Sequence, residues 1–309
     1  MSSKRADCLL LFCFEISRGS NSIVSMDEDS RWRHLYGKKL EIDVVDSFRF
    51  FQQHGVEPIL IKGWVAAQNY PPDVRRHYDD VDLAVSKSDF KIAKHLLSTE
   101  AGSRIGVDLH CEFRHLDTKP WNDVLKDSRQ VSLNGVSIRI PSAEDHLRIL
   151  AVHWLNDGGA RKDRLWDVYY AVKNRPATFD WDRCLNSVSD VRRQWIIAAI
   201  GLAHKYLDLD ISGFPSAESA KVLPPWLVAA VEKEWKSGVR LKSLHTCLRE
   251  PRELLKQIRK RVPPNPLQAT IEMEGNFDNG LRFRYQLGSM LNRIRPSVRG
   301  IVSTLTRRP

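Results

Sequence analysis

The sequence has few cysteines and no long apolar segment, and each shortage excludes a class of protein. Its 309 residues include five cysteines, an odd number, and no two of them form a CxxC pair. A disulfide framework or a zinc ribbon is therefore not expected, and reduced thiols indicate a cytoplasmic protein. No apolar run approaches the roughly 18–20 residues that cross a bilayer, so we expect no membrane contact.

Positive charge is concentrated near the C-terminus. The net charge is +10, and residues 250–309 hold 12 Lys/Arg against five Asp/Glu, a balance of +7. Basic segments contact nucleic acid, anionic lipid or acidic partners, although many are only solvated surface. We expect residues 249–309 to be an accessory basic segment whose candidate partner is a polyanion.

The spacing of apolar residues divides the rest of the chain into two parts. Up to residue 140, alternating stretches typical of strands, such as Asp80–Val85 and Val107–Phe113, are mixed with helical patterns. After Pro141 only helical patterns follow, beginning at the N-cap residue Ser142. We predict an α+β fold with a disordered or misassigned extension (1–30), a small mixed-sheet domain (31–140) and an α-helical domain (141–248).

Three other local patterns bear on the fold. Apolar residues at mixed three- and four-residue steps predict a helix from Trp32 to His54. Asn134-Gly135, a strong turn signal, predicts a hairpin over residues 131–140. The nine tryptophans lie mostly on apolar helix faces, and we predict that they are core residues instead of base-stacking platforms.

Three aspartates on two predicted strands are the candidate catalytic residues. Asp80 and Asp82 are two residues apart, so their side chains point the same way, about 6–7 Å apart along the strand. Such a pair is costly unless solvated or neutralised, and a divalent cation is the usual neutraliser. Asp108 lies on the polar face of the second strand, next to His110. If the strands pair, the carboxylates can hold one or two Mg²⁺ (or Mn²⁺) ions, which activate an attacking oxygen and stabilise a leaving phosphate.

A second group of residues has the order of a phosphate-binding turn. Lys62-Gly63 follows a short apolar run and precedes a predicted short helix. Glycine allows a close backbone approach, and N–H groups at a helix start face an anion. Arg76, four residues before Asp80, adds a cation within reach of a triphosphate. An ordinary strand-to-helix turn is the alternative interpretation of Lys62-Gly63.

Taken together, these motifs resemble a known family. Ile59-Leu-Ile-Lys-Gly63, Tyr70-Pro71, Arg76 with Asp80-Val-Asp-Leu83, and Val107-Asp-Leu-His110 are similar to the uncharacterised bacterial nucleotidyltransferases of the DNA polymerase beta-like superfamily. The resemblance continues at His153, at Arg164-Leu-Trp-Asp167 and at Leu223-Pro-Pro-Trp226, and covers roughly residues 32–235. Without the resemblance, interhelical hydrogen bonds would explain His153 and Asp167.

The resemblance implies transfer of a nucleoside monophosphate from an NTP to an unknown hydroxyl acceptor, a small molecule or a protein, with pyrophosphate leaving. It implies that Asp80 and Asp82 hold the metals and that Asp108 binds the catalytic metal and helps to deprotonate the acceptor. Lys62 and Gly63 would lie under the triphosphate, and Arg76 would steady it.

Two alternatives stay open. This chain has Lys62-Gly63 where the superfamily has Gly-Gly or Gly-Ser, and only 25 residues separate Asp82 from Asp108. A catalytically inactive nucleotidyltransferase fold that serves as a binding or regulatory module is therefore one alternative. A nucleic-acid-binding protein that uses the basic C-terminal segment is the other.

Overall fold

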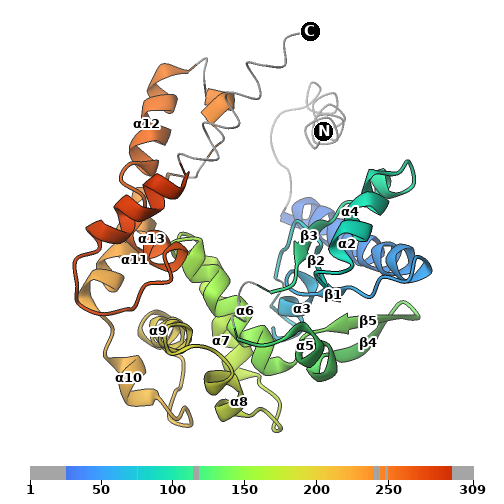
Figure 1. Ribbon diagram of the computed structural model, residues 1–309, viewed down its shortest axis with the longest axis horizontal. Coiled ribbons are helices and arrows are strands. Elements are labelled where there is room, and N and C mark those ends of the chain that lie inside the picture. Colours follow the sequence, from blue (N-terminus) through green and yellow to red (C-terminus); the bar gives the residue numbers. More distant parts are fainter. Residues whose placement is uncertain are drawn as a thin grey trace.

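A computed structural model of the chain describes residues 26–74, 76–113, 118–239, 242, 244–247 and 250–293. A sheet and its helices lie on one side of the molecule and a larger group of helices lies on the other, with α6 (Ala143–Asn156) between them (Figure 1). This arrangement confirms the α+β prediction. Most of the predicted N-terminal extension lies outside the described residues, but helix α2 (Met26–Gln53) already begins at Met26 instead of Trp32.

The sheet that carries the site has three short strands in the order β1 (Ile59–Leu60), β2 (Asp82–Val85) and β3 (Asp108–Cys111). β1 is antiparallel to β2, whereas β2 and β3 are parallel, with Asp82 opposite Asp108. β2 therefore begins at Asp82 and not at Asp80, because its ladder with β3 starts there. The helices on this side are α3 (Trp64–Ala67), α4 (Phe90–Ser98), α5 (Trp121–Asp127) and the 3-10 turn η1 (Gly102–Arg104).

A separate hairpin, β4 (Arg129–Leu133) and β5 (Val136–Ile140), confirms the prediction made from Asn134-Gly135. Leu133 pairs with Val136, so the turn has two residues, and both have positive φ, 49° and 78°. Such a turn matches the twist of the strands that it joins.

Strand β2 is buried on both faces. Val81, Leu83 and Val85 share one core with α2, as the alternation predicts, and Phe48 and Phe51 of that helix are fully buried there. Ala84 faces a second core with residues of β1 and α6. A strand covered on both faces is held rigidly, so the side chains at its ends are held in fixed positions.

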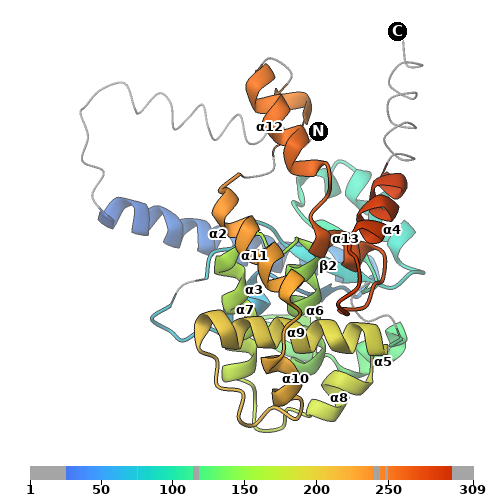
Figure 2. The ribbon, with the colours of Figure 1, turned by 90° about the vertical axis from the view of Figure 1, so that its left-hand side faces the viewer.

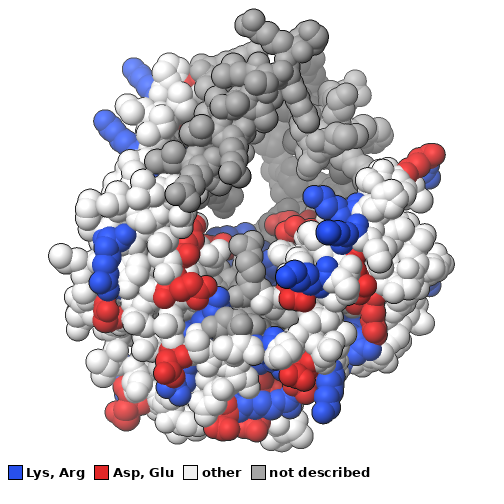
Figure 3. All heavy atoms as spheres, viewed as in Figure 1, with Lys and Arg blue, Asp and Glu red and all other residues white. Residues whose placement is uncertain are grey.

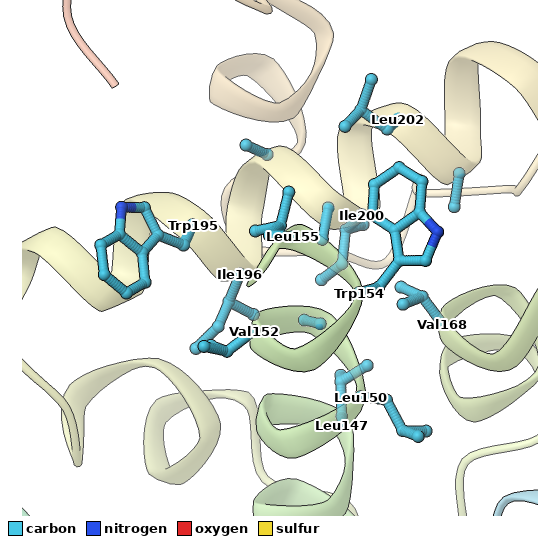
Figure 4. Packing of buried hydrophobic residues seen from close by; sticks show 14 of the residues in the cluster. Leu147, Leu150, Val152, Trp154, Leu155, Val168, Trp195, Ile196, Ile200 and Leu202 are labelled. Carbon is cyan, nitrogen blue, oxygen red and sulfur yellow. The ribbon is translucent and has the colours of Figure 1, made fainter. Parts of the chain in front are cut away.

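Helix α9 (Asp190–Leu207) organises the helical side, where it crosses α6 and α7 (Leu165–Lys173) (Figure 2). α6 begins as predicted, because the Ser142 hydroxyl accepts a hydrogen bond of 3.1 Å from the Asp145 backbone N–H. Trp154 and Trp195 are buried among aliphatic side chains, which confirms the core prediction for these two (Figure 4). The other elements are η2 (Lys162–Arg164), α8 (Trp181–Asn186), α10 (Ala217–Lys221), α11 (Pro225–Ser237), η3 (Leu244–Cys247), α12 (Pro251–Arg261), α13 (Pro266–Glu272) and a helix over 283–293.

Part of the predicted basic segment packs into the helical core. α13 packs against α6, and Leu267, Ile271 and Phe277 are buried in the same core as α9. That residues 249–309 are an accessory segment stays a prediction, but its excess of cations gave no sign of the apolar residues that enter the core. Among the described residues, every helix falls short of the length and apolarity that crossing a bilayer requires.

Phe48 tests the packing of α2 on the sheet. Phe48→Ala should lower the free energy of unfolding by about 3–5 kcal/mol, since it removes a fully buried ring and leaves a cavity. Ile42→Ala on the same helix removes a side chain that is 54% exposed and should cost less than about 0.5 kcal/mol. Chemical denaturation measures both, and equal losses would show that α2 is not packed as described.

Candidate active site

The parallel pairing of β2 with β3 brings two of the predicted catalytic aspartates together. Asp82 and Asp108 are directly opposite each other in the ladder, so their side chains leave the sheet on the same side. His110, two residues after Asp108, faces that side as well. Its Nε2 lies 3.1 Å from Asp82 Oδ1 and 3.3 Å from Asp108 Oδ2.

These three side chains have the chemistry and spacing of a metal site. One ligand atom from each of Asp82, Asp108 and His110 lies within 4.8 Å of the other two. Atoms that each lie 2.0–2.6 Å from one ion are at most about 5 Å apart, so the set fits a single divalent cation. Carboxylates suit Mg²⁺ and Mn²⁺, and an imidazole is a common ligand of Mn²⁺ and heavier ions.

Lys62 is the counter-ion of the buried member of the set. Its Nζ lies 2.7 Å from Asp82 Oδ1, and the Asp82 side chain is only 3% exposed. Burial alone would raise the pKa of Asp82, but the hydrogen bond from His110 and the charge of Lys62 outweigh burial and hold that pKa below its ordinary value. Asp82 is therefore ionised at neutral pH and ready to bind a cation.

Asp80 is placed differently from the other two aspartates. It precedes β2 and is exposed. Partial burial is the largest cause that raises the pKa of Asp80, and the negative charge of Asp82 raises it further. Asp80 is therefore close enough to Asp82 to interact with it electrostatically. Among the described residues, however, the compact set of ligand atoms contains His110 and not Asp80. A role of Asp80 as metal ligand stays a prediction.

The Lys62-Gly63 turn has a backbone that only glycine adopts readily. Gly63, at the start of α3, has φ 57° and ψ −108°, and a Cβ there would lie 3.2 Å from the Asp80 carbonyl oxygen. Arg76 donates from Nη1 to the Gly63 carbonyl oxygen over 3.0 Å and makes two further bonds to Asp167. Arg76 thus lies behind the turn, and its predicted contact with a triphosphate stays a prediction.

The cluster opens into a cleft of about 750 Å³ between the sheet and the helical side. Figure 3 shows the surface hollowed between these two sides. The sheet contributes Lys62, Asp108 and His110 to the lining. The helical wall comprises Val152, His153 and Asn156 of α6, Arg192 and Trp195 of α9, Ile271 and Glu272 of α13, and Glu274.

Sequence reasoning missed most of this helical wall. Of its residues, His153 belongs to the family resemblance. Burial lowers the pKa of the His153 imidazole. Arg192 and Glu274 belong to none of the sequence motifs. In the structure, Arg192 Nη2 lies 2.7 Å from Glu274 Oε1, so the two residues form an ion pair in the wall. An arginine on an otherwise apolar helix face was the one local signal.

Comparison with known proteins gives a family match. The model of a family described as uncharacterised nucleotidyltransferase matches residues 40–208. No curated protein and no solved structure matches the chain. The matched region includes the sheet, the whole carboxylate cluster and the helices α6 to α9, but not α13.

The metal set predicts a binding result that does not depend on turnover. Asp108→Asn and His110→Ala should each weaken Mn²⁺ binding about tenfold or more, because each removes one ligand. Asp79→Asn, an exposed neighbour outside the set, should bind Mn²⁺ like the unmodified protein. Calorimetric titration measures all three, and full affinity in Asp108→Asn would contradict the assignment.

Proposed function

The chain belongs to the family of uncharacterised nucleotidyltransferases, and on that premise we propose that it transfers a nucleoside monophosphate from an NTP to a hydroxyl acceptor in a metal-dependent reaction. The observation that carries the proposal is the juxtaposition of Asp82 and Asp108 on neighbouring parallel strands at the edge of a large cleft. Phosphoryl-type transfers need this arrangement, because their catalysis consists mainly of positioning and charge stabilisation.

In the proposed reaction the acceptor oxygen attacks the α-phosphorus of the NTP. A bond forms between them, and the bond from the α-phosphorus to the oxygen that bridges to the β-phosphate breaks, with its electron pair leaving on pyrophosphate. Bound Mg²⁺ or Mn²⁺ would supply positive charge at the α-phosphate and lower the pKa of the acceptor hydroxyl. The acceptor proton passes to the carboxylate of Asp108, whose side chain is 62% exposed and lines the cleft.

The other site residues divide between metal and triphosphate. Asp82, Asp108 and His110 would hold one metal ion, and Asp80, beside Asp82, would be a further ligand. Lys62 is within reach of both Asp82 and the cleft, so it can exchange its ion pair for a phosphate oxygen when a metal takes its place. Gly63 lets the backbone approach the triphosphate, and Arg76 supports that turn from behind.

The acceptor is proposed to lie against the helical wall. The volume of the cleft suits an NTP together with a small molecule or a single side chain of a protein. The unpaired cysteines Cys111, Cys184 and Cys247 are in keeping with a cytoplasmic setting, where NTPs are abundant. A polyanion contact is proposed only for α12, which exposes Arg252, Lys256 and Arg259.

Incubation with labelled NTPs and Mg²⁺ or Mn²⁺ tests the proposal directly. We expect release of pyrophosphate and label on the acceptor, and Asp82→Asn should lower the rate at least a thousandfold while leaving the fold intact. Glu57→Gln, a carboxylate-to-amide change remote from the cleft, is the control. NTP binding without pyrophosphate release would indicate a catalytically inactive binding module instead. Salt-sensitive binding of nucleic acid, without NTP binding, would indicate a nucleic-acid-binding protein.

Replacing Lys62 should change the affinities for Mn²⁺ and for an NTP in opposite directions. Lys62→Met removes the cation that competes with a metal for Asp82 Oδ1, so Mn²⁺ alone should bind about threefold tighter or more. The NTP, which loses one charge-assisted hydrogen bond, should bind about tenfold or more weakly. Calorimetry with each ligand separately measures both, and a loss of both affinities would refute the exchange of Lys62 between Asp82 and phosphate.

A further inference from the structure

We propose that Asp167, on helix α7 of the helical side, is a positioning residue for the nucleotide site and acts through Arg76 on the Gly63 turn. This inference rests on the proposed function, because it concerns the affinity of that site for an NTP. Asp167 does not line the cleft and is outside the metal set. Its effect on a nucleotide is therefore transmitted by the residues that it holds.

The contact between Asp167 and Arg76 is bidentate. Arg76 Nε lies 2.6 Å from Asp167 Oδ1, and Arg76 Nη2 lies 2.7 Å from Oδ2. Tyr70 donates its hydroxyl to the same Oδ1 over 2.6 Å. Two parallel bonds fix the plane of the guanidinium as well as its position. The remaining nitrogen, Nη1, consequently points in one direction, toward the carbonyl oxygen of Gly63 at 3.0 Å.

The Gly63 turn needs such a support. With φ 57° and ψ −108°, Gly63 occupies a conformation that few residues adopt, next to Lys62 in a turn that must keep its shape under a triphosphate. Glycine has the largest backbone freedom to lose, so an unsupported turn would sample other conformations. Its carbonyl oxygen accepts from the Ala67 N–H over 3.2 Å, and the hydrogen bond from the Arg76 side chain adds a second donor that favours the same conformation.

Burial explains why Arg76 works from behind and not as a direct ligand. The side chains of Arg76 and Asp167 are 8% and 7% exposed. A buried ion pair adds little to stability compared with an apolar pair of the same size, because desolvation offsets the attraction. Unlike an apolar pair, however, the ion pair fixes the orientation of the Arg76 side chain. In this orientation Arg76 donates its hydrogen bond to the Gly63 turn.

The pair is the centre of a longer seam between the two sides of the molecule. Asn174 donates to the Asn69 carbonyl oxygen over 2.7 Å, and Arg164 donates to the His77 carbonyl oxygen over 2.9 Å. Arg164 and Asp167 are three residues apart and so lie on one face of the helical segment. Asn69, Tyr70, Arg76 and His77 are thus tied to α7, to its C-cap residue and to η2.

The test compares the unmodified protein with Asp167→Asn and with the double variant Arg76→Met/Asp167→Leu. The double variant removes both charges, so it leaves no single buried charge to unfold the protein. We expect both variants to bind a non-hydrolysable NTP with Mg²⁺ about tenfold or more weakly, because Gly63 loses its fixed donor. Mn²⁺ binding without nucleotide should stay within about twofold, because none of the metal set touches the seam. Hydrogen exchange of the backbone around residues 62–66 should be faster in both variants.

The outcomes separate this inference from the proposed function. Glu57→Gln, which breaks another long-range pair at Arg139 Nε (2.8 Å), should leave both affinities unchanged and serves as the matched control. If the unmodified protein binds no NTP, the proposed function fails and the positioning role fails with it. If the unmodified protein binds NTP and the double variant binds it equally well, only the positioning role of Asp167 is overturned. A loss of Mn²⁺ binding in the variants would also overturn it, since the effect would then be general unfolding.

Discussion

The candidate site depends on one strand pairing, the parallel ladder between β2 and β3. Because Asp82 is directly opposite Asp108, a shift of one residue would turn either carboxylate into the core and separate the ligand set. The register is secured by burial of β2 on both faces, against α2 on one and against β1 and α6 on the other. Parallel strands need a crossover, and the short connection through α4 and η1 is sufficient for it here. The short spacing between Asp82 and Asp108 therefore leaves the sheet of the cluster complete.

Local patterns in the sequence were enough for the strands of the sheet side and for part of the site. Alternation identified the faces of β2, Asn134-Gly135 located the hairpin, and Ser142 marked the start of α6. The convergence of Asp82 with Asp108 followed from their facing alone. Arg76 could not be placed in this way, because its partner is 91 positions away and the order of charges along the chain does not reveal which cation meets a phosphate and which meets a carboxylate.

The helical wall was beyond sequence reasoning for a related physical cause. Its residues come from three helices, and α13 packs against α6 and α11. The net charge of a segment is a property of its whole composition and does not show where single apolar residues lie. The positive charge beyond residue 249 therefore gave no indication of the three apolar side chains that pack into the core. What a segment contributes to a cleft is decided by a few buried residues and not by its net charge.

The late position of α13 in the chain has a consequence for biosynthesis. The sheet with Asp82 and Asp108 leaves the ribosome long before α13, and domains tend to fold in the order in which they emerge. A nascent chain can therefore assemble its carboxylates while part of the opposite wall, Ile271, Glu272 and Glu274, has not yet been made. Until α13 docks on α6, water has free access to the cleft from that side. Completion of translation thus separates a chain whose cleft lacks part of one wall from a chain whose cleft is complete.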